Sequence, residues 1–152
     1  MSDIRQLYQR IIIDHANYPH HYGKLACPDF VRTCRNPDCG DTITVFVSID
    51  TDCFNELNFV GDGCAISQAS ASIMTDTLID KTVAEATQLI QEFQKLLLGQ
   101  HITTGDLGDS VVFGKLKQFP TRVRCGALAW HAVSDVIEEW GKRSGQQINF
   151  SK

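Results

Sequence analysis

Three cysteines and one aspartate lie at positions where their side chains could meet around a metal ion. Cys39 lies in a turn rich in proline and glycine, Cys64 in a glycine turn, and Cys125 in the expected first turn of a helix. Asp41 is two residues from Cys39, so both side chains can face one side of an extended turn. Thiolates and carboxylates are ligands of tetrahedral Zn²⁺. If these turns meet, the four residues form a zinc site.

Spacing alone leaves a purely structural role open for these residues. The sequence has no C-x-x-C motif, and residues so far apart along the chain need not meet. Cysteine is often buried as a small hydrophobic residue, and we interpret Cys27, Cys34 and Cys53 as buried or incidental thiols. His20 and His21 could supply metal-binding nitrogens, although a solvent-exposed pair is the favoured interpretation.

The first half of the chain contains the elements that would carry the first two of these turns. Residues 4–15 have apolar side chains at helical spacing, and residues 42–51 alternate between Ile or Val and other side chains, as a half-buried strand does. A short strand is expected over residues 30–34, and the alternation over residues 57–61 predicts an antiparallel hairpin. Both turns would therefore lie at strand ends.

Helices are expected in the second half. Residues 67–80 form a helix rich in small side chains, which permit close packing against a neighbour. Thr82 and Glu85 fit a capping box that begins the next helix, and Gly99 fits the position after its end. Residues 122–141 have an apolar side at helical spacing.

The order of strands and helices predicts an α+β fold with two layers, a small antiparallel sheet and helices packed on it. We expect residues 1–152 to form one domain, since single cores of about 100–200 residues are the norm. Residues 100–114, rich in Gly, Asp and Thr, are expected to be a loop or a poorly ordered insertion.

Composition excludes several classes of function. With 43% hydrophobic and 21% charged residues, the chain is neither disordered nor fibrous. A net charge of −4 argues against binding to nucleic acid, and no apolar run is long enough to span a membrane. The N-terminus lacks the pattern of a secretory signal, so we expect a cytoplasmic protein. Its six cysteines then indicate metal binding or sulfur chemistry.

Three separated motifs resemble a known family. They are N-P-x-C-G-D over residues 36–41, G-x-G-C-x-I-S-x-A-S over residues 61–70, and R-C over residues 124–125 followed by L-x-W over residues 128–130. In this order they resemble the IscU/SufU family of iron–sulfur cluster assembly proteins, related to the N-terminal domain of NifU. The resemblance covers nearly the whole chain and implies an IscU/SufE-like fold.

The resemblance implies that the metal ligands are Cys39, Asp41, Cys64 and Cys125. It favours the SufU branch at three places. Arg124 stands where IscU proteins have histidine, F-P-T-R over residues 119–122 replaces their P-P-V-K stretch, and more residues separate the second and third ligand cysteines.

SufU proteins serve as zinc-containing sulfur acceptors of a cysteine desulfurase. The resemblance therefore implies a SufS-like desulfurase as partner and a sulfurtransferase role through a persulfide on Cys39, rather than a stand-alone enzyme. Three thiolates and a carboxylate give a zinc site a formal charge of −2, which is costly to bury. We expect Arg124 to offset this charge by hydrogen bonding to a ligand.

Two other functions use the same residues. Cys39, Cys64 and Cys125 could instead hold iron in a [2Fe–2S] cluster, which a scaffold protein would pass to a downstream scaffold or to apo-proteins. A purely structural zinc in an inert binding module is the alternative from another class. A zinc hydrolase is disfavoured, because motifs such as H-E-x-x-H are absent from the sequence.

Overall fold

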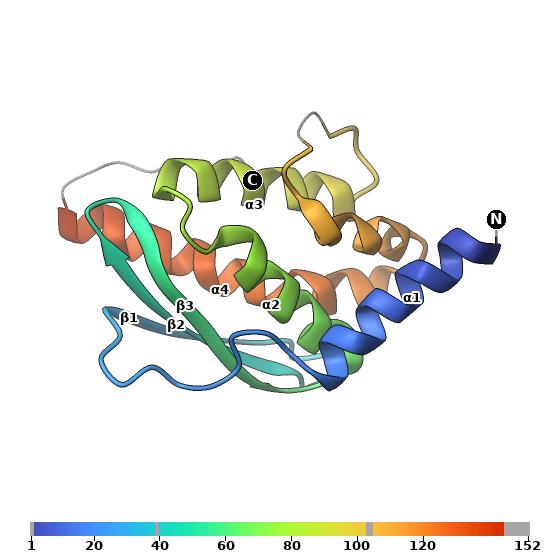
Figure 1. Ribbon diagram of the computed structural model, residues 1–152, viewed down its shortest axis with the longest axis horizontal. Helices are drawn as coiled ribbons and strands as arrows, with labels where there is room; N and C mark the ends of the chain where they lie inside the picture. Colours follow the sequence, from blue (N-terminus) through green and yellow to red (C-terminus); the bar gives the residue numbers. More distant parts are fainter. Residues whose placement is uncertain (1, 39, 103–104, 145–152) are drawn as a thin grey trace.

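The computed structural model describes residues 2–38, 40–102 and 105–144, and it has three antiparallel strands with helices packed against them (Figure 1). This arrangement confirms the predicted α+β class. In chain order the elements are α1 (Ser2–Asn17), β1 (Phe30–Arg35), β2 (Thr42–Asp50), β3 (Cys53–Asp62), α2 (Ala65–Leu78), α3 (Val83–Leu97), the 3₁₀ helix η1 (Gly108–Gln118) and α4 (Pro120–Ser144).

The sheet has the strand order β1-β2-β3, with both pairs antiparallel. The predicted alternation along β2 is only partly confirmed. Ile43, Val45 and Val47 are fully buried, but Phe46 and Ser48 of the other face are buried as well, so the strand is more than half buried. Val45 pairs with Arg32 of β1 and with Phe59 of β3. Because β2 is paired on both edges, its two ends hold the turns that lead to β1 and β3 in fixed positions.

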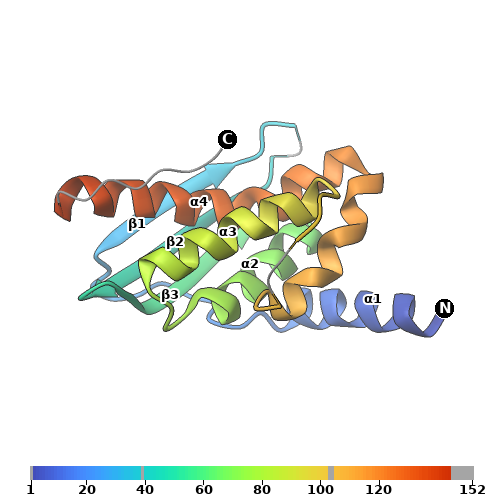
Figure 2. The same cartoon turned by 90° about the horizontal axis from the view of Figure 1, so that it is seen from above.

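The helices lie over one face of the sheet (Figure 2). α4 packs against β1 and β2, and α2 packs against β3. α3 and η1 pack against α4 in turn. At this junction the ring of Phe93 stacks on Trp130 with centroids 3.9 Å apart, and Phe113 meets Phe93 edge-on at 6.1 Å. The helical layer therefore has an aromatic core of its own above the sheet.

Polar groups fix α2 against α4 within this core. Ser70 Oγ accepts a hydrogen bond from Trp130 Nε1 at 3.0 Å and donates one to the carbonyl oxygen of Gly126 at 2.5 Å. All three polar atoms belong to buried contacts, where a lost hydrogen bond is costly. Ala69 and Ala71 are fully buried beside Ser70. The small side chains thus permit the close packing that the sequence predicts.

Local signals at α3 are confirmed. Thr82 Oγ1 accepts the backbone N–H of Glu85 at 3.0 Å, and the N–H of Thr82 donates to Glu85 Oε1 at 2.9 Å. This is the predicted capping box. Gly99, two residues after the helix ends, has a φ of +76°, a conformation that glycine adopts without steric cost.

The expectation of a loop over residues 100–114 is wrong for its second half, where η1 begins at Gly108. Leu107, Val112, Phe113 and Leu116 are buried, so this segment contributes to the core. Leu107, Phe113 and Leu116 share a three-residue period with the buried Ser110, which suits a 3₁₀ helix. The many Gly, Asp and Thr residues around them obscure that pattern in the sequence. Residues 103–104 lie outside the described residues.

α4 begins two residues earlier than predicted, with Pro120 at its first position. Proline is favoured there because it has no N–H to leave unpaired. Cys125 therefore lies in the second turn of the helix and not in the first. No helix among the described residues combines the length and the apolar character needed to cross a membrane.

Candidate metal centre

Three of the four predicted ligands meet at one end of the sheet. Asp41, Cys64 and Cys125 each offer a ligand atom, and these atoms lie within 4.8 Å of one another. Asp41 precedes β2, Cys64 precedes α2, and Cys125 belongs to α4. Cys39 lies outside the described residues, so its predicted place in the set stays a prediction.

The turn between β1 and β2 fixes the backbone of Asp41. The N–H of Asn36 donates to the carbonyl oxygen of Asp41 at 2.8 Å, and the N–H of Gly40 donates to that of Asn36 at 2.7 Å. Gly40 has a φ of +78°, a conformation that glycine adopts without steric cost. Asp38 donates its N–H to Asn36 Oδ1 at 3.1 Å. Two backbone bonds and one side-chain bond thus close this turn.

Cys64 is the N-cap residue of α2 and has extended backbone angles. The helix begins at Ala65, two residues before the predicted start. The free N–H groups and the dipole at a helix N-terminus favour a thiolate. Cys64 lies at such a helix N-terminus, whereas Cys125 lies in the second turn of α4.

Two neighbours from the β3–α2 segment orient the carboxylate of Asp41. Ser67 donates its hydroxyl to Asp41 Oδ2 at 2.6 Å and lies 3.6 Å from Cys64 Sγ. A Cβ atom at Gly63 would lie 2.7 Å from Asp41 Cγ, so only glycine fits without a shift. Asp41 is 6% exposed. A buried carboxylate beside two thiols is a set of donors that suits a bound cation.

Cys125 is 3% exposed and has two polar neighbours. Asn36 Nδ2 donates to Cys125 Sγ at 3.8 Å, and Cys125 Sγ–H donates to the carbonyl oxygen of Thr121 at 3.7 Å. Hydrogen bonding of this kind orients a metal ligand. Asn36 and Ser67, which hydrogen-bond to Cys125 and Asp41, were not predicted in this role. The motif places Asn36 in a turn, but only the fold brings it to Cys125, 89 residues away.

Arg124 has a different partner from the expected one. Its guanidinium forms an ion pair with Asp38, and its side chain is 67% exposed. The expected hydrogen bond from Arg124 to a metal ligand therefore stays a prediction, whereas the contact that the structure shows joins α4 to the β1–β2 turn.

Cys34, although it lies on the strand before this turn, is poorly suited to metal binding. Burial, together with the nearby carboxylate of Asp135, raises the pKa of the Cys34 thiol to about 11. The thiol lies 3.8 Å from Asp135 Oδ2. A thiol that stays protonated near neutral pH is neither a good ligand nor a nucleophile. Cys27 is exposed.

The donor set fits a zinc ion. Two thiols and one carboxylate converge, and tetrahedral zinc takes thiolate and carboxylate oxygen as ligands. The third predicted cysteine, in the β1–β2 turn, is the remaining candidate for the fourth position. A carboxylate is a harder donor than thiolate and matches a borderline-soft metal less well. The arrangement is therefore suited to a metal site whose ligands can exchange.

The fold and the converging thiols lead to one family. The chain matches the family of NifU-like N-terminal domains over residues 7–147. It therefore belongs to that family, which confirms the resemblance inferred from the three motifs, and it is a member of the IscU/SufU group of iron–sulfur cluster assembly proteins.

Two relatives span nearly the whole chain. The iron–sulfur cluster assembly scaffold protein IscU of Streptococcus pyogenes is 37% identical over 139 residues, covering 91% of this chain and 87% of its own length. The zinc-dependent sulfurtransferase SufU of Bacillus subtilis is 33% identical over 143 residues, covering 92% of this chain and 97% of its own.

Solved structures have the same fold. A candidate scaffold protein for the SUF system of Fervidobacterium islandicum aligns with a TM-score of 0.82 and 31% identity, covering 87% of this chain and 97% of that one. The N-terminal part of a NifU-like protein from Brucella abortus aligns with a TM-score of 0.83 and 26% identity, covering 92% and 98%.

Proposed function

We propose that this protein is a zinc-dependent sulfur acceptor in iron–sulfur cluster assembly, which takes persulfide sulfur from a cysteine desulfurase through Cys39. The observation that carries the proposal is the convergence of Asp41, Cys64 and Cys125 within 4.8 Å, next to the turn that contains Cys39. A cytoplasmic location, where thiols stay reduced, would suit this chemistry.

Sequence differences favour the sulfur acceptor over the scaffold. By its resemblance to the family, the chain has Arg124 at the position where IscU proteins have histidine. It also has F-P-T-R over residues 119–122 in place of their P-P-V-K stretch. The longer segment before Cys125 contains η1, whose buried residues belong to the core. A relative named as a zinc-dependent sulfurtransferase matches 92% of this chain.

The chain's own residues account for the transfer step. The Cys39 thiolate attacks the outer sulfur of the desulfurase persulfide, and the bond between the two persulfide sulfurs breaks. The outer sulfur then forms a persulfide on Cys39, and the desulfurase cysteine leaves as a thiolate. Cys39 thus gains the oxidation level that the desulfurase cysteine loses, so no further oxidant is needed. Zinc, when bound, would keep the cysteine ligands deprotonated near neutral pH.

Asp41, Cys64 and Cys125 would stay in place during this step. Asp41 is held by Ser67 and Cys125 receives a hydrogen bond from Asn36. Cys64 caps α2, which is fixed to α4 through Ser70. Cys39, in contrast, belongs to a turn that connects two strands, so its release would leave both strands paired.

The decisive experiment measures desulfurase turnover with the wild-type protein, with Cys39→Ala and with Cys27→Ala as matched control. We expect Cys39→Ala to abolish stimulation and to carry no persulfide in mass spectra, with an unchanged circular dichroism spectrum. Cys27→Ala, at an exposed cysteine outside the cluster, should behave as wild type. Full stimulation by Cys39→Ala would refute the proposal.

A scaffold for a [2Fe–2S] cluster is the second candidate, favoured by the 37% identical relative named IscU. It predicts an oxygen-sensitive brown cluster that passes to an apo-protein. Elemental and absorbance measurements on the purified protein separate the two. Tight zinc without visible absorbance supports sulfur transfer, and a transferable cluster supports the scaffold.

A further inference from the structure

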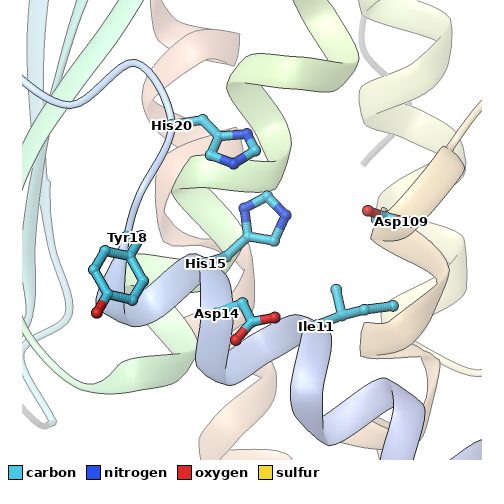
Figure 3. Close-up of a pocket in the computed structure, with 6 residues that line it drawn as sticks. All are labelled: Ile11, Asp14, His15, Tyr18, His20 and Asp109. Atoms are coloured by element: carbon cyan, nitrogen blue, oxygen red, sulfur yellow. The ribbon is translucent and has the colours of Figure 1, made fainter.

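Two histidines and an aspartate outside the cysteine cluster form a second group of metal-ligand side chains. His15, His20 and Asp76 each offer a ligand atom, and these atoms lie within 4.8 Å of one another. His15 is in the last turn of α1, His20 follows that helix, and Asp76 belongs to α2. The imidazole rings of His15 and His20 face each other, with centroids 4.5 Å apart (Figure 3).

The favoured interpretation of His20 and His21 as a solvent-exposed pair is incomplete. His20 Nδ1 lies 2.5 Å from Asp76 Oδ2, and His21 Nε2 lies 3.3 Å from Asp76 Oδ1. The sequence could not show this, because Asp76 is more than 50 residues away and only the packing of α1 on α2 brings the groups together. Two imidazoles thus share one carboxylate.

The surrounding residues orient both ligand histidines. His15 Nδ1 lies 2.7 Å from Ser72 Oγ, which also accepts the backbone N–H of His20 at 2.7 Å. The contact to His15 involves a ring nitrogen, as in metal-binding histidines whose second ring nitrogen is hydrogen-bonded, whereas the contact to His20 involves its backbone. The backbone after His20 is bonded to β3, because the N–H of Phe59 donates to the carbonyl oxygen of His21 at 3.1 Å. The group is therefore built into the fold rather than carried on a free loop.

The charges around the group favour a cation. A cavity of about 300 Å³ is lined by His15 and His20 together with the carboxylates of Asp14 and Asp109 (Figure 3). The adjoining cavity adds Asp106 and the cation Lys81. Carboxylates outnumber the lysine among these lining residues, so the local potential is negative and raises the local concentration of cations.

We propose that His15, His20 and Asp76 form a second metal site, which takes a divalent first-row transition ion such as Zn²⁺ without any sulfur ligand. Imidazole nitrogen and carboxylate oxygen are ligands of zinc and its neighbours in the series. Three protein ligands leave a coordination position for a water or a further ligand, which the open cavity can admit. The ion would replace the hydrogen bond between His20 and Asp76 and would join α1 to α2.

The test is a titration of the wild-type protein with Co²⁺, whose thiolate complexes have intense sulfur-to-metal charge-transfer bands. The cysteine cluster gives these bands, and the proposed site cannot. We expect a second equivalent of Co²⁺ to bind and to be retained through gel filtration while adding nothing to the charge-transfer bands. His20→Gln and Asp76→Asn should each lower the affinity for the second Co²⁺ ion by at least about tenfold, since even the loss of a residue that orients a ligand has an effect of this size.

The control is His131→Gln, which changes an exposed histidine on α4. It should retain the second equivalent at wild-type affinity. Retention of only one equivalent by the wild type, unchanged binding in His20→Gln, or charge-transfer bands from the second equivalent would each overturn the proposal. The first equivalent reports on the cysteine cluster separately, so failure of the proposed sulfur transfer would leave this result intact.

Discussion

Gly63 determines where the Asp41 carboxylate can lie. The absence of a side chain at Gly63 leaves room for Asp41 Cγ, which would be 2.7 Å from a Cβ atom, and Ser67 holds the carboxylate from the other segment. The position of this candidate ligand therefore depends on the space left by Gly63 in the β3–α2 turn and on one hydrogen bond from Ser67 in the first turn of α2.

Gly63→Ala should weaken zinc binding by about 10–100-fold, as the loss of an orienting partner does, because the new methyl group displaces the Asp41 carboxylate. Competition against a chromophoric chelator measures the affinity. Gly105→Ala is the matched control, since a Cβ there meets no atom within 4 Å. Equal zinc affinity in both variants would show that Asp41 is not a ligand.

At the residue scale, the sequence identifies the candidate metal ligands better than it identifies the residues that hydrogen-bond to them. Asp41, Cys64 and Cys125 stand in motifs next to turns, so local pattern and family resemblance point to them. Asn36 and Ser67 are polar residues of common types, and their hydrogen bonds to ligands depend on contacts across the fold. No periodicity in the chain marks such contacts.

Among the elements, η1 contributes buried residues to the core, although the composition of its segment predicts a loop. Phe113 is fully buried and meets Phe93 edge-on, although the surrounding segment is rich in Gly and Asp. Its buried positions follow a three-residue period, but the polar Ser110 occupies one of them, so the apolar residues alone do not show the pattern. The cap of α3 at Thr82, in contrast, depends only on residues three positions apart and was predictable.

Phe113→Ala should lower the free energy of unfolding by about 3–5 kcal/mol, because it removes a buried aromatic ring and leaves a cavity. Urea unfolding followed by circular dichroism measures the change. Val111→Ala is on the same helix, but Val111 is 39% exposed, so this substitution should lower the free energy of unfolding by less than about 0.5 kcal/mol. A loop without packing would give similarly small changes in both variants.

For the whole molecule, the candidate metal centre and the core are separate. The candidate ligands come from the β1–β2 turn, the start of α2 and α4, while the aromatic core lies around Phe93, Phe113 and Trp130. The fold should therefore survive loss of zinc, unlike small domains that unfold without it.

Removal of zinc with a chelator should lower the melting temperature by about 5–10 °C. A ligand present at about 100 times its dissociation constant contributes about 2.7 kcal/mol, and each kcal/mol shifts the midpoint by about 2–4 °C at this size. The far-ultraviolet circular dichroism spectrum should stay unchanged at 25 °C. Differential scanning calorimetry of the two forms checks this, and complete unfolding would support a purely structural zinc.

Trp130 gives the molecule an optical probe of its own. Its indole is 1% exposed and donates to Ser70, on the same helix that Cys64 caps, while α4 carries both Trp130 and Cys125. A shift of α2 along α4 would disturb this bond and change the surroundings of the ring. In Trp140→Phe, where Trp130 is the remaining tryptophan, the wavelength of fluorescence emission would follow such a shift in real time, without an added dye.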